Sequence, residues 1–196
     1  MTKATAAGQQ GPATLIRCER IHLVAPRKAA AAAVLEFYQR NQAHFARWDP
    51  PMPPGFLSVS HQAERIGQAS DAFTAGTGFR YWLVEPSAPR RVVGSVHFSS
   101  VVRGAFQSAM LGYALDEPLQ GRGLMTEALQ AGIAEMFSAR VNLHRVQAAV
   151  QPDNARSIAL VARLGFDRIG LAPGYLWIAG AWRDHLLWQR LNPAST

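Results

Sequence analysis

The chain of 196 residues contains few cysteines, few lysines and no long apolar segment. Its single cysteine, Cys18, excludes an internal disulfide bond and a zinc site made of cysteines. No apolar run approaches the length of about 18 residues that a membrane-spanning helix needs. Charged residues make up only 17% of the chain and hydrophobic residues 48%, which excludes a largely disordered protein and is typical of a folded globular one.

The beginning of the chain also lacks the apolar core of a secretory signal peptide. Together with the lone thiol, this indicates a cytoplasmic protein. Residues 1–12 are small and polar, and we expect a disordered tail there. The remaining length fits one domain of roughly 150 residues, so residues 13–196 are predicted to form a single domain. Cys18 lies in the alternating segment LIRCERIHL, where a buried and unreactive thiol is expected.

The basic side chains are nearly all arginine, and they outnumber the acidic ones. The formal net charge is +7, from 20 basic and 13 acidic residues. Only Lys3 and Lys28 are lysines, so 20 − 2 = 18 residues are arginine. The planar guanidinium group suits phosphate and carboxylate partners, and such an excess suggests an anionic ligand or surface. High genomic GC content would also raise the arginine count, and the sequence leaves both explanations open.

Hydrophobic periodicity predicts an α/β fold with a mixed sheet. We expect a strand over residues 15–24, a helix after Pro26, a proline-rich loop WDPPMPPGF and a helix over 58–75. Three antiparallel strands follow, within FRYWLVE, RVVGSVHFSSVV and AMLGYALD. A long amphipathic helix begins at Leu124. After it, strands and helices alternate: a strand HRVQAAV is followed by a helix over 153–164. The chain then ends with the strands GFDRIGLA and AWRDHLLWQRL, and YLWI is a possible further strand between them.

A short glycine-rich loop joins a predicted strand to the long helix. Its residues and the helix start are Gln120, Gly121, Arg122, Gly123, Leu124 and Met125. The first N–H groups of a helix have no internal partner and favour an anion, and glycines let the backbone approach a phosphate closely. Thr126 breaks the dinucleotide fingerprint G-x-G-x-x-G, and the G-K-[ST] of a Walker loop is absent. By itself, the loop is either a pyrophosphate cradle or a plain tight turn.

A second motif lies about thirty residues later, in QPDNARSIALVARLGF. Asn154 and Ser157 are three residues apart, so they share one face at the start of the predicted short helix. Helix capping by Asp153 or Asn154 explains this pattern without any ligand. Capping alone does not explain why both motifs occur together.

The two motifs together resemble the GNAT superfamily of acetyl-CoA-dependent N-acetyltransferases, and more closely its RimJ/RimL family, nearest to the RimJ members. The resemblance is strong from about Phe98 to Arg190 and looser from Leu15 to Glu85. It is carried by FSSVVRGAF, LGYAL, QGRGLMTEAL, NLHRVQA, NARS, RLGF and GAWRDH. In the looser half, NQAHFARWDP is similar to the family's N-terminal lid region.

The resemblance implies a GNAT fold with a mixed, mostly antiparallel sheet of about seven strands flanked by helices. It implies transfer of the acetyl group of acetyl-CoA directly to the N-terminal α-amino group, in RimJ an alanine, of a ribosomal protein. Acetyl-CoA is then the cosubstrate, with no metal, and ribosome association is possible; the chain would be a monomer or homodimer with no membrane partner. Two alternatives stay open: acetylation of a small-molecule amine, and a ribosome- or RNA-associated assembly factor.

The resemblance also assigns roles to individual residues. The backbone of Tyr113, Ala114 and Leu115 would bind the pantetheine arm, and Gln120 through Met125 would surround the pyrophosphate. Asn154 would bind the cofactor arm, and Ser157 would act as the acid for the leaving thiolate. Tyr175 is the second implied catalytic residue and, with Trp177, would line the acceptor groove. Arg122, Arg156 and Arg163 would meet the cofactor phosphates; Phe45, Trp48 and Phe56 would cover the groove or be plain core aromatics.

The general base is not identified by the sequence. Relatives often have an acidic residue where this chain has Gly174. An α-amine with a pKa of about 7.8 is roughly one-seventh neutral at pH 7, so water would suffice as the base. Other candidates are Glu85, His97 and Asp184, although Asp184 with His185 also reads as a structural pair at a strand end, and His97 as a packed or surface residue. Glu127 is predicted to be a solvated helix residue.

Overall fold

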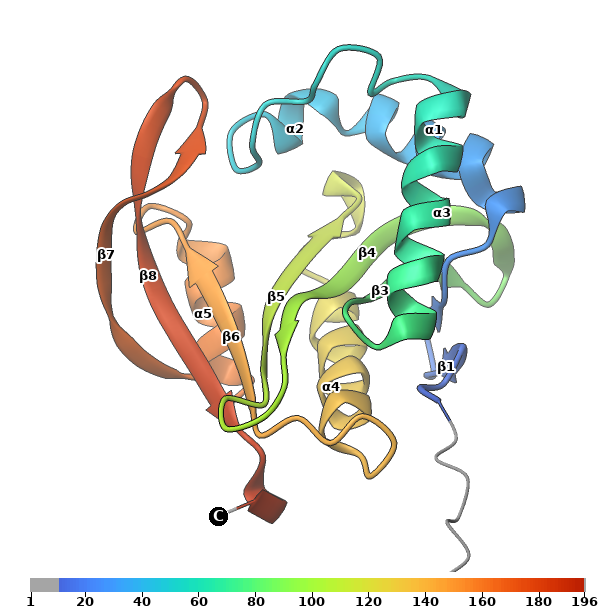
Figure 1. Cartoon of the computed structure of the whole chain (residues 1–196). Coiled ribbons are helices and arrows are strands. Elements are labelled where there is room, and N and C mark those ends of the chain that lie inside the picture. Colours follow the sequence, from blue (N-terminus) through green and yellow to red (C-terminus); the bar gives the residue numbers. More distant parts are fainter. Residues whose placement is uncertain (1–10, 196) are drawn as a thin grey trace, which may run out of the picture.

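The computed structural model describes residues 11–195, and its centre is a mixed sheet of eight strands (Figure 1). The predicted tail therefore lies outside the described residues except for its last two positions. The strands are β1 (Leu15–Arg17), β2 (His22–Val24), β3 (Phe79–Glu85), β4 (Ala88–Val102), β5 (Ser108–Leu115), β6 (Arg145–Val150), β7 (Asp167–Ile178) and β8 (Ala181–Leu191). Their order is β1-β2-β3-β4-β5-β6-β8-β7, and only the β5–β6 pair is parallel.

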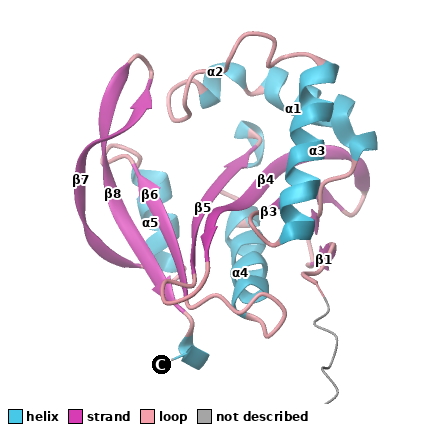
Figure 2. Cartoon of the chain, in the orientation of Figure 1, coloured by secondary structure: helices cyan, strands magenta, loops and turns pink. Residues whose placement is uncertain are grey.

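Helices cover both faces of this sheet (Figure 2). The α-helices are α1 (Ala31–Arg40), α2 (Gln42–Phe45), α3 (Val59–Ala75), α4 (Leu124–Phe137) and α5 (Ala155–Arg163), and short 3-10 turns are η1 (Lys28–Ala30), η2 (Glu117–Leu119) and η3 (Pro193–Ser195). Helices α4 and α5 pack with the strands in one hydrophobic core, while α1, part of α3 and the Trp82 side of the sheet form a second. None of the described helices is long and apolar enough to cross a membrane.

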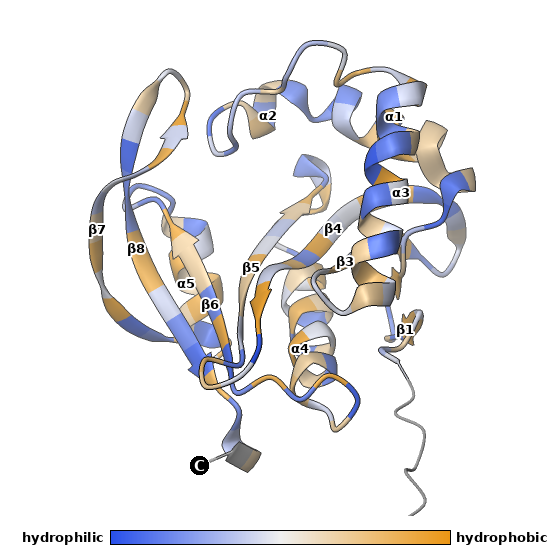
Figure 3. Cartoon of the chain, in the orientation of Figure 1, coloured by the Kyte–Doolittle hydropathy of each residue, from blue (hydrophilic) through white to orange (hydrophobic). Residues whose placement is uncertain are grey.

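The local sequence explains where these elements begin and end. Ser58 caps α3 by accepting a hydrogen bond from the backbone N–H of His61, and Gly76 ends the helix in the left-handed conformation. In Figure 3 hydrophobic and hydrophilic residues are interspersed along the strands, α4 and α3, and α3 has one face in solvent. The helix expected over 58–75 and the proline-rich loop before it are confirmed.

Two strand predictions are wrong in detail. The strand expected over residues 15–24 is a hairpin of β1 and β2, because the chain turns where the N–H of Cys18 donates to the carbonyl of Ile21. At the other end of the chain, GFDRIGLA and YLWI form one continuous strand, β7, with irregular pairing between Ala172 and Leu176. The mixed, mostly antiparallel architecture is confirmed, with eight strands instead of about seven.

Strands β5 and β6 separate halfway along their length (Figure 1). Their parallel pairing ends at Leu111 and Ala148, whereas β5 stays paired with β4 up to Leu115. Residues 112–115 thus present one backbone edge that is paired with no strand in the described part of the chain. An edge of this kind offers backbone N–H and C=O groups to an extended ligand.

Candidate active site

The unpaired edge of β5 contains three residues that the sequence places at a cofactor arm: Tyr113, Ala114 and Leu115. Asp116 and η2 follow directly, and α4 then begins at Leu124. The parallel connection from β5 through α4 to β6 therefore brings the start of α4 close to the end of the strand edge. Strand edge and helix start belong to one continuous site.

The loop before α4 has the conformation that its glycines predict. Gly121 and Gly123 both have positive φ angles, 76° and 79°, which side chains rarely tolerate. In the described structure no side chain caps the helix at Gly123, and its first i to i−4 bond is donated by the N–H of Glu127. The preceding N–H groups and the helix dipole thus form a place for an anion. The predicted loop-to-helix junction is confirmed, since α4 begins at Leu124, and the pyrophosphate role of residues 120–125 stays a prediction.

Hydrogen bonds from Arg20, which the sequence analysis did not predict, hold this loop against α4. The guanidinium group of Arg20 donates to the carbonyl oxygen of Arg122 at 2.9 Å and to Glu127 Oε2 at 2.8 Å. Although burial raises the pKa of Glu127, the hydrogen bonds and charge of Arg20 outweigh it and lower that pKa. The prediction of Glu127 as a solvated helix residue is wrong, because this carboxylate is 18% exposed and fixes the loop.

Gln120 connects the loop to two other elements. Its Nε2 atom lies 2.7 Å from His44 Nε2 in α2, and its Oε1 atom accepts from Arg156 Nη1 at 2.9 Å. Arg156 therefore stands beside the loop, as predicted. Arg163 is exposed at the opposite end of α5 and makes no contact with the loop in the described structure, so its phosphate role stays a prediction.

The contacts of Asn154 fit both the helix-capping interpretation and the ligand-binding interpretation of its motif. Its Oδ1 atom accepts from the N–H of Ser157 at 3.1 Å, which is the helix cap. Its amide nitrogen has no hydrogen bond to any described residue, so a donor remains for a ligand. Capping orients this donor, since the carbonyl side of the amide is held by the helix.

Tyr113 and Ser157 face each other across the start of α5. Burial raises the pKa of Tyr113, and the neighbouring Ser157 hydroxyl lowers it by a smaller amount. The phenol oxygen is buried and outside hydrogen-bond geometry with every described residue. A buried polar group without a partner is unfavourable, so this oxygen is suited to a polar group of a ligand.

The segment of residues 41–50, which resembles the family's lid region, contacts the far side of the site. The carbonyl of Trp48 accepts from Gln151 Nε2 at 3.4 Å, just after β6, and Arg47 pairs with Asp153 at 3.5 Å. The next residue, Asp49, is half-buried, and burial raises the pKa of its carboxyl group to about 6. Its carboxylate has no hydrogen bond or ion pair among the described residues. The sequence analysis missed Asp49, which lies in the segment that resembles a lid.

The aromatic residues predicted at the acceptor groove differ in their exposure to solvent. Phe45 and Phe56 are buried in the second core against Tyr38, so they are core aromatics. Tyr175 and Trp177 in β7 are 38% and 46% exposed and remain available for an acceptor.

The candidates for a general base differ sharply. Asp184 Oδ1 accepts from the N–H of Gly174 at 2.8 Å, a contact between β8 and the irregular middle of β7, so its structural partner is Gly174 and not the predicted His185. Burial lowers the pKa of His97 to about 3, with smaller contributions from two arginines, so this imidazole is neutral at pH 7. The thiol of Cys18 has a raised pKa through burial and the nearby Glu127, which agrees with an unreactive cysteine, although its side chain is only partly buried.

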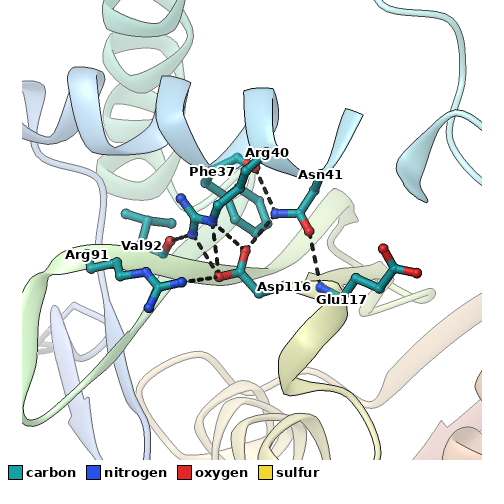
Figure 4. A network of polar contacts seen from close by, with 7 residues as sticks. All are labelled: Phe37, Arg40, Asn41, Arg91, Val92, Asp116 and Glu117. Atoms are coloured by element: carbon teal, nitrogen blue, oxygen red, sulfur yellow. Dashed lines mark hydrogen bonds and ion pairs between the residues drawn. The ribbon is translucent and has the colours of Figure 1, made fainter. Parts of the chain in front are cut away.

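A network of hydrogen bonds and ion pairs around Asp116 joins the end of α1 to the end of β5 (Figure 4). We call it the Asp116 network: Arg40, Asn41, Arg91 and Asp116, with backbone groups of Val92 and Glu117. The carboxylate is 2% exposed and accepts from Arg40 Nη2 at 2.9 Å, Asn41 Nδ2 at 2.6 Å and Arg91 Nη2 at 3.3 Å. Arg40 also donates to the carbonyl of Val92, and Asn41 accepts from the N–H of Glu117. The network fixes the end of α1 next to the loop.

Comparisons with known proteins agree with this geometry. Residues 20–167 match the family described as the acetyltransferase (GNAT) domain. The chain is 37% identical over 161 residues to the ribosomal protein uS5-alanine N-acetyltransferase of Escherichia coli strain K12, and the match covers 82% of each sequence.

Solved structures show the same similarity. The ribosomal-protein-S5-alanine acetyltransferase from Vibrio fischeri superposes with a TM-score of 0.87 at 31% identity, covering 91% of this chain and 97% of that one. The RimJ protein of Mycobacterium smegmatis, in complex with CoA-disulfide, gives 0.85 at 29% identity over 92% and 88% of the two chains.

Proposed function

The chain belongs to the family of GNAT acetyltransferases, and we propose that it transfers the acetyl group of acetyl-CoA to the N-terminal alanine of a ribosomal protein. The observation that carries the reaction is the unpaired edge of β5, which leads into an uncapped helix start with two left-handed glycines. The uS5-alanine activity of the relatives supports the acceptor. Residues 13–196 would then form one acetyltransferase domain that acts in the cytoplasm, near the ribosome.

The residues at the site fit acetyl-CoA. The N–H groups at Gly123 and Leu124 suit a pyrophosphate, and the edge of Tyr113 to Leu115 suits an amide-containing arm. The free amide nitrogen of Asn154 and the orphaned phenol of Tyr113 add two polar groups along the same path. Acetyl-CoA would supply an acetyl group that is activated as a thioester. No metal is needed for this chemistry.

Direct transfer requires three actions from the protein. A backbone N–H on the edge of β5 would donate to the carbonyl oxygen on which negative charge develops. The hydroxyl of Ser157, at the capped start of α5 and beside Tyr113, would protonate the leaving sulfur. The attacking α-amine must lose a proton, and we assign its acceptance to Asp49, which directly follows the contact of Trp48 with Gln151 at the end of β6 and whose pKa of about 6 suits a base at neutral pH.

Mass spectrometry of acetylated products tests this proposal. The chain is incubated with acetyl-CoA and peptides that begin with Ala, Ser or Met, and in parallel with spermidine and free lysine. We expect a gain of one acetyl group at the N-terminus, fastest for the alanine peptide. A gain confined to spermidine or lysine would instead assign the chain to small amines.

The Ser157→Ala variant then grades the site. Acid–base groups contribute about a hundredfold or more, so kcat should fall by about that factor. The matched control is Ser70→Ala, which removes a partly buried hydroxyl from α3, away from the site. A rate within about twofold of the unmodified protein would remove Ser157 from the acid role.

A further inference from the structure

A cavity of about 310 Å³ lies between α3 and the paired strands β3 and β4. Its charged and polar lining includes Arg65 and Gln68 from α3, Arg80 from β3 and His97 from β4. We call this cavity the arginine pocket. None of the functional residues predicted for the cofactor lines it, and among the described residues around it there is no carboxylate.

The pocket gathers its basic groups from two strands and a helix. Arg80 and His97 are direct cross-strand partners in the antiparallel register, so their side chains project from the same face of the sheet. Arg65 approaches from α3, where its guanidinium group lies 4.4 Å from the centre of the Phe56 ring and donates to Gln62 Oε1 at 2.9 Å. Both arginines are close enough to His97 to lower its pKa further.

Arg80 has no anionic partner. Its guanidinium group makes no hydrogen bond and no ion pair with any described residue. It lies over the ring of Trp82, with 5.6 Å between Arg80 Cζ and the centre of the ring. Burial lowers the pKa of Arg80, with a further lowering from Arg65 and an opposing effect of Tyr38. His97 Nδ1 is likewise buried without a partner in the described structure. Buried charges in proteins are normally paired, so a ligand anion would complete this site.

One residue of the arginine pocket, His97, lies against the start of the unpaired edge of β5. His97 pairs with Gly112, and its imidazole covers that residue so closely that any side chain at position 112 would collide with it. Gly112 is also the first residue of the unpaired edge of β5. Arg80 lies two strands away, about 10 Å at a strand spacing of about 4.8 Å, which an extended peptide crosses in about three residues.

We propose that the arginine pocket binds a carboxylate side chain of the acceptor protein, located about three or four residues after its acetylated N-terminus. The inference rests on the proposed function, and it adds an acidic residue to the alanine as a determinant of the acceptor. Arg80 supplies the fixed charge, Arg65 the second charge, and the neutral imidazole of His97 one hydrogen bond.

A peptide series tests the proposal. Each ten-residue peptide begins with Ala and is otherwise neutral, and Glu or Gln is placed singly at positions two to six. We expect kcat/KM to favour Glu over Gln at one position, the third or fourth residue after the N-terminus, by about tenfold to a hundredfold, as for a hydrogen-bonded charge. Arg80→Gln should bring this ratio close to one, and Arg80→Glu should favour Lys over Gln at the same position.

The controls separate the possible failures. Arg90→Gln removes the same charge from an exposed position of β4 and should keep the ratio, and Arg65→Gln gives a second readout if the Arg80 variants do not fold. Equal rates with Glu and Gln at every position would overturn the pocket while the proposed function stands. Activation of the neutral peptide by inorganic phosphate, without a preference for Glu, would assign the pocket to a free anion. Absence of any peptide acetylation would overturn both proposals.

Discussion

Two groups of arginines on the same side of the sheet are built in opposite ways. In the Asp116 network a buried carboxylate collects donors from Arg40, Asn41 and Arg91, and it does so within one chain. In the arginine pocket the guanidinium group of Arg80 has no carboxylate among the described residues. The first arrangement is complete and holds a loop in place, whereas the second is completed only by something that the chain does not contain.

Substitution of Asp116, the centre of the Asp116 network, should have the largest effect on the stability of the chain. Asp116→Ala leaves the guanidinium group of Arg40 without its carboxylate, and because Arg40 is 30% exposed we expect a cost of about 3 kcal/mol of unfolding free energy, the lower end of the range for a broken buried ion pair. We expect a fall of this size in urea denaturation followed by circular dichroism. A loss below about 1 kcal/mol would show that the network adds little to the stability of the chain.

Asp49 provides the contrast to Asp116, since it is a carboxylate without described partners. Asp49→Asn should lower kcat/KM by up to about a hundredfold. Below pH 6 the logarithm of kcat/KM should rise with a slope of about two, because Asp49, with its pKa of about 6, and an α-amine with a pKa of about 7.8 both lose protons.

The pH profile of the variant decides the role of Asp49. Without this carboxylate only the amine titrates, so the slope should be about one throughout the acid limb. An unchanged slope of two would show that another group accepts the proton. Asp71→Asn, on α3, serves as the matched control and should leave the profile as it is.

Removing Arg80 should act in the opposite direction from removing Asp116. Arg80 is a partly buried charge without a counter-ion among the described residues, so Arg80→Met, which keeps an apolar stem, should raise the unfolding free energy by up to about 1 kcal/mol. Thermal unfolding without peptide measures this effect. A marked loss of stability would show that Arg80 has a structural partner and would remove the contrast between the two groups.

The smallest effect is expected for the exposed pair of Arg47 and Asp153, whose side chains are 67% and 63% accessible. Asp153→Asn should change the unfolding free energy by less than about 0.5 kcal/mol, because solvent screens such pairs. The same denaturation experiment provides the reference for Asp116. A change above about 1 kcal/mol would mean that the lid is held mainly through this contact.

Local sequence patterns were sufficient for most of the helices and strands. The amphipathic repeat predicted α4, and Ser58 with Gly76 marks the ends of α3. The hairpin of β1 and β2 was missed because its alternation continues across the turn, so periodicity shows no break there. The loop from Gln120 to Met125 was found because glycines at the start of a predicted helix are visible in one short segment, and the structure adds that Gly121 and Gly123 have left-handed φ angles.

The missed residues depend on contacts between distant parts of the chain. Arg20 and Glu127 are 107 positions apart, and no local pattern connects them. Arg80 looks like an ordinary strand residue until its neighbours are known to lack a carboxylate. Asp49 is one of 13 acidic residues, and only its burial distinguishes it from the others.

The one parallel pair among the described strands, β5 and β6, also sets the distance between the end of β5 and the start of α4. A parallel neighbour requires a crossover, and here the crossover is α4, so the start of this helix lies a fixed distance beyond the last residue of β5. The strand edge from Gly112 to Leu115 adds about 10 Å to that distance. In the proposed function, the start of α4 would bind the pyrophosphate and the strand edge would hold the acetyl group. Under the proposed function, the site would select its acetyl donor by length as well as by chemistry, and a change in the number of residues between Leu115 and Gly123 would alter the length that it accepts.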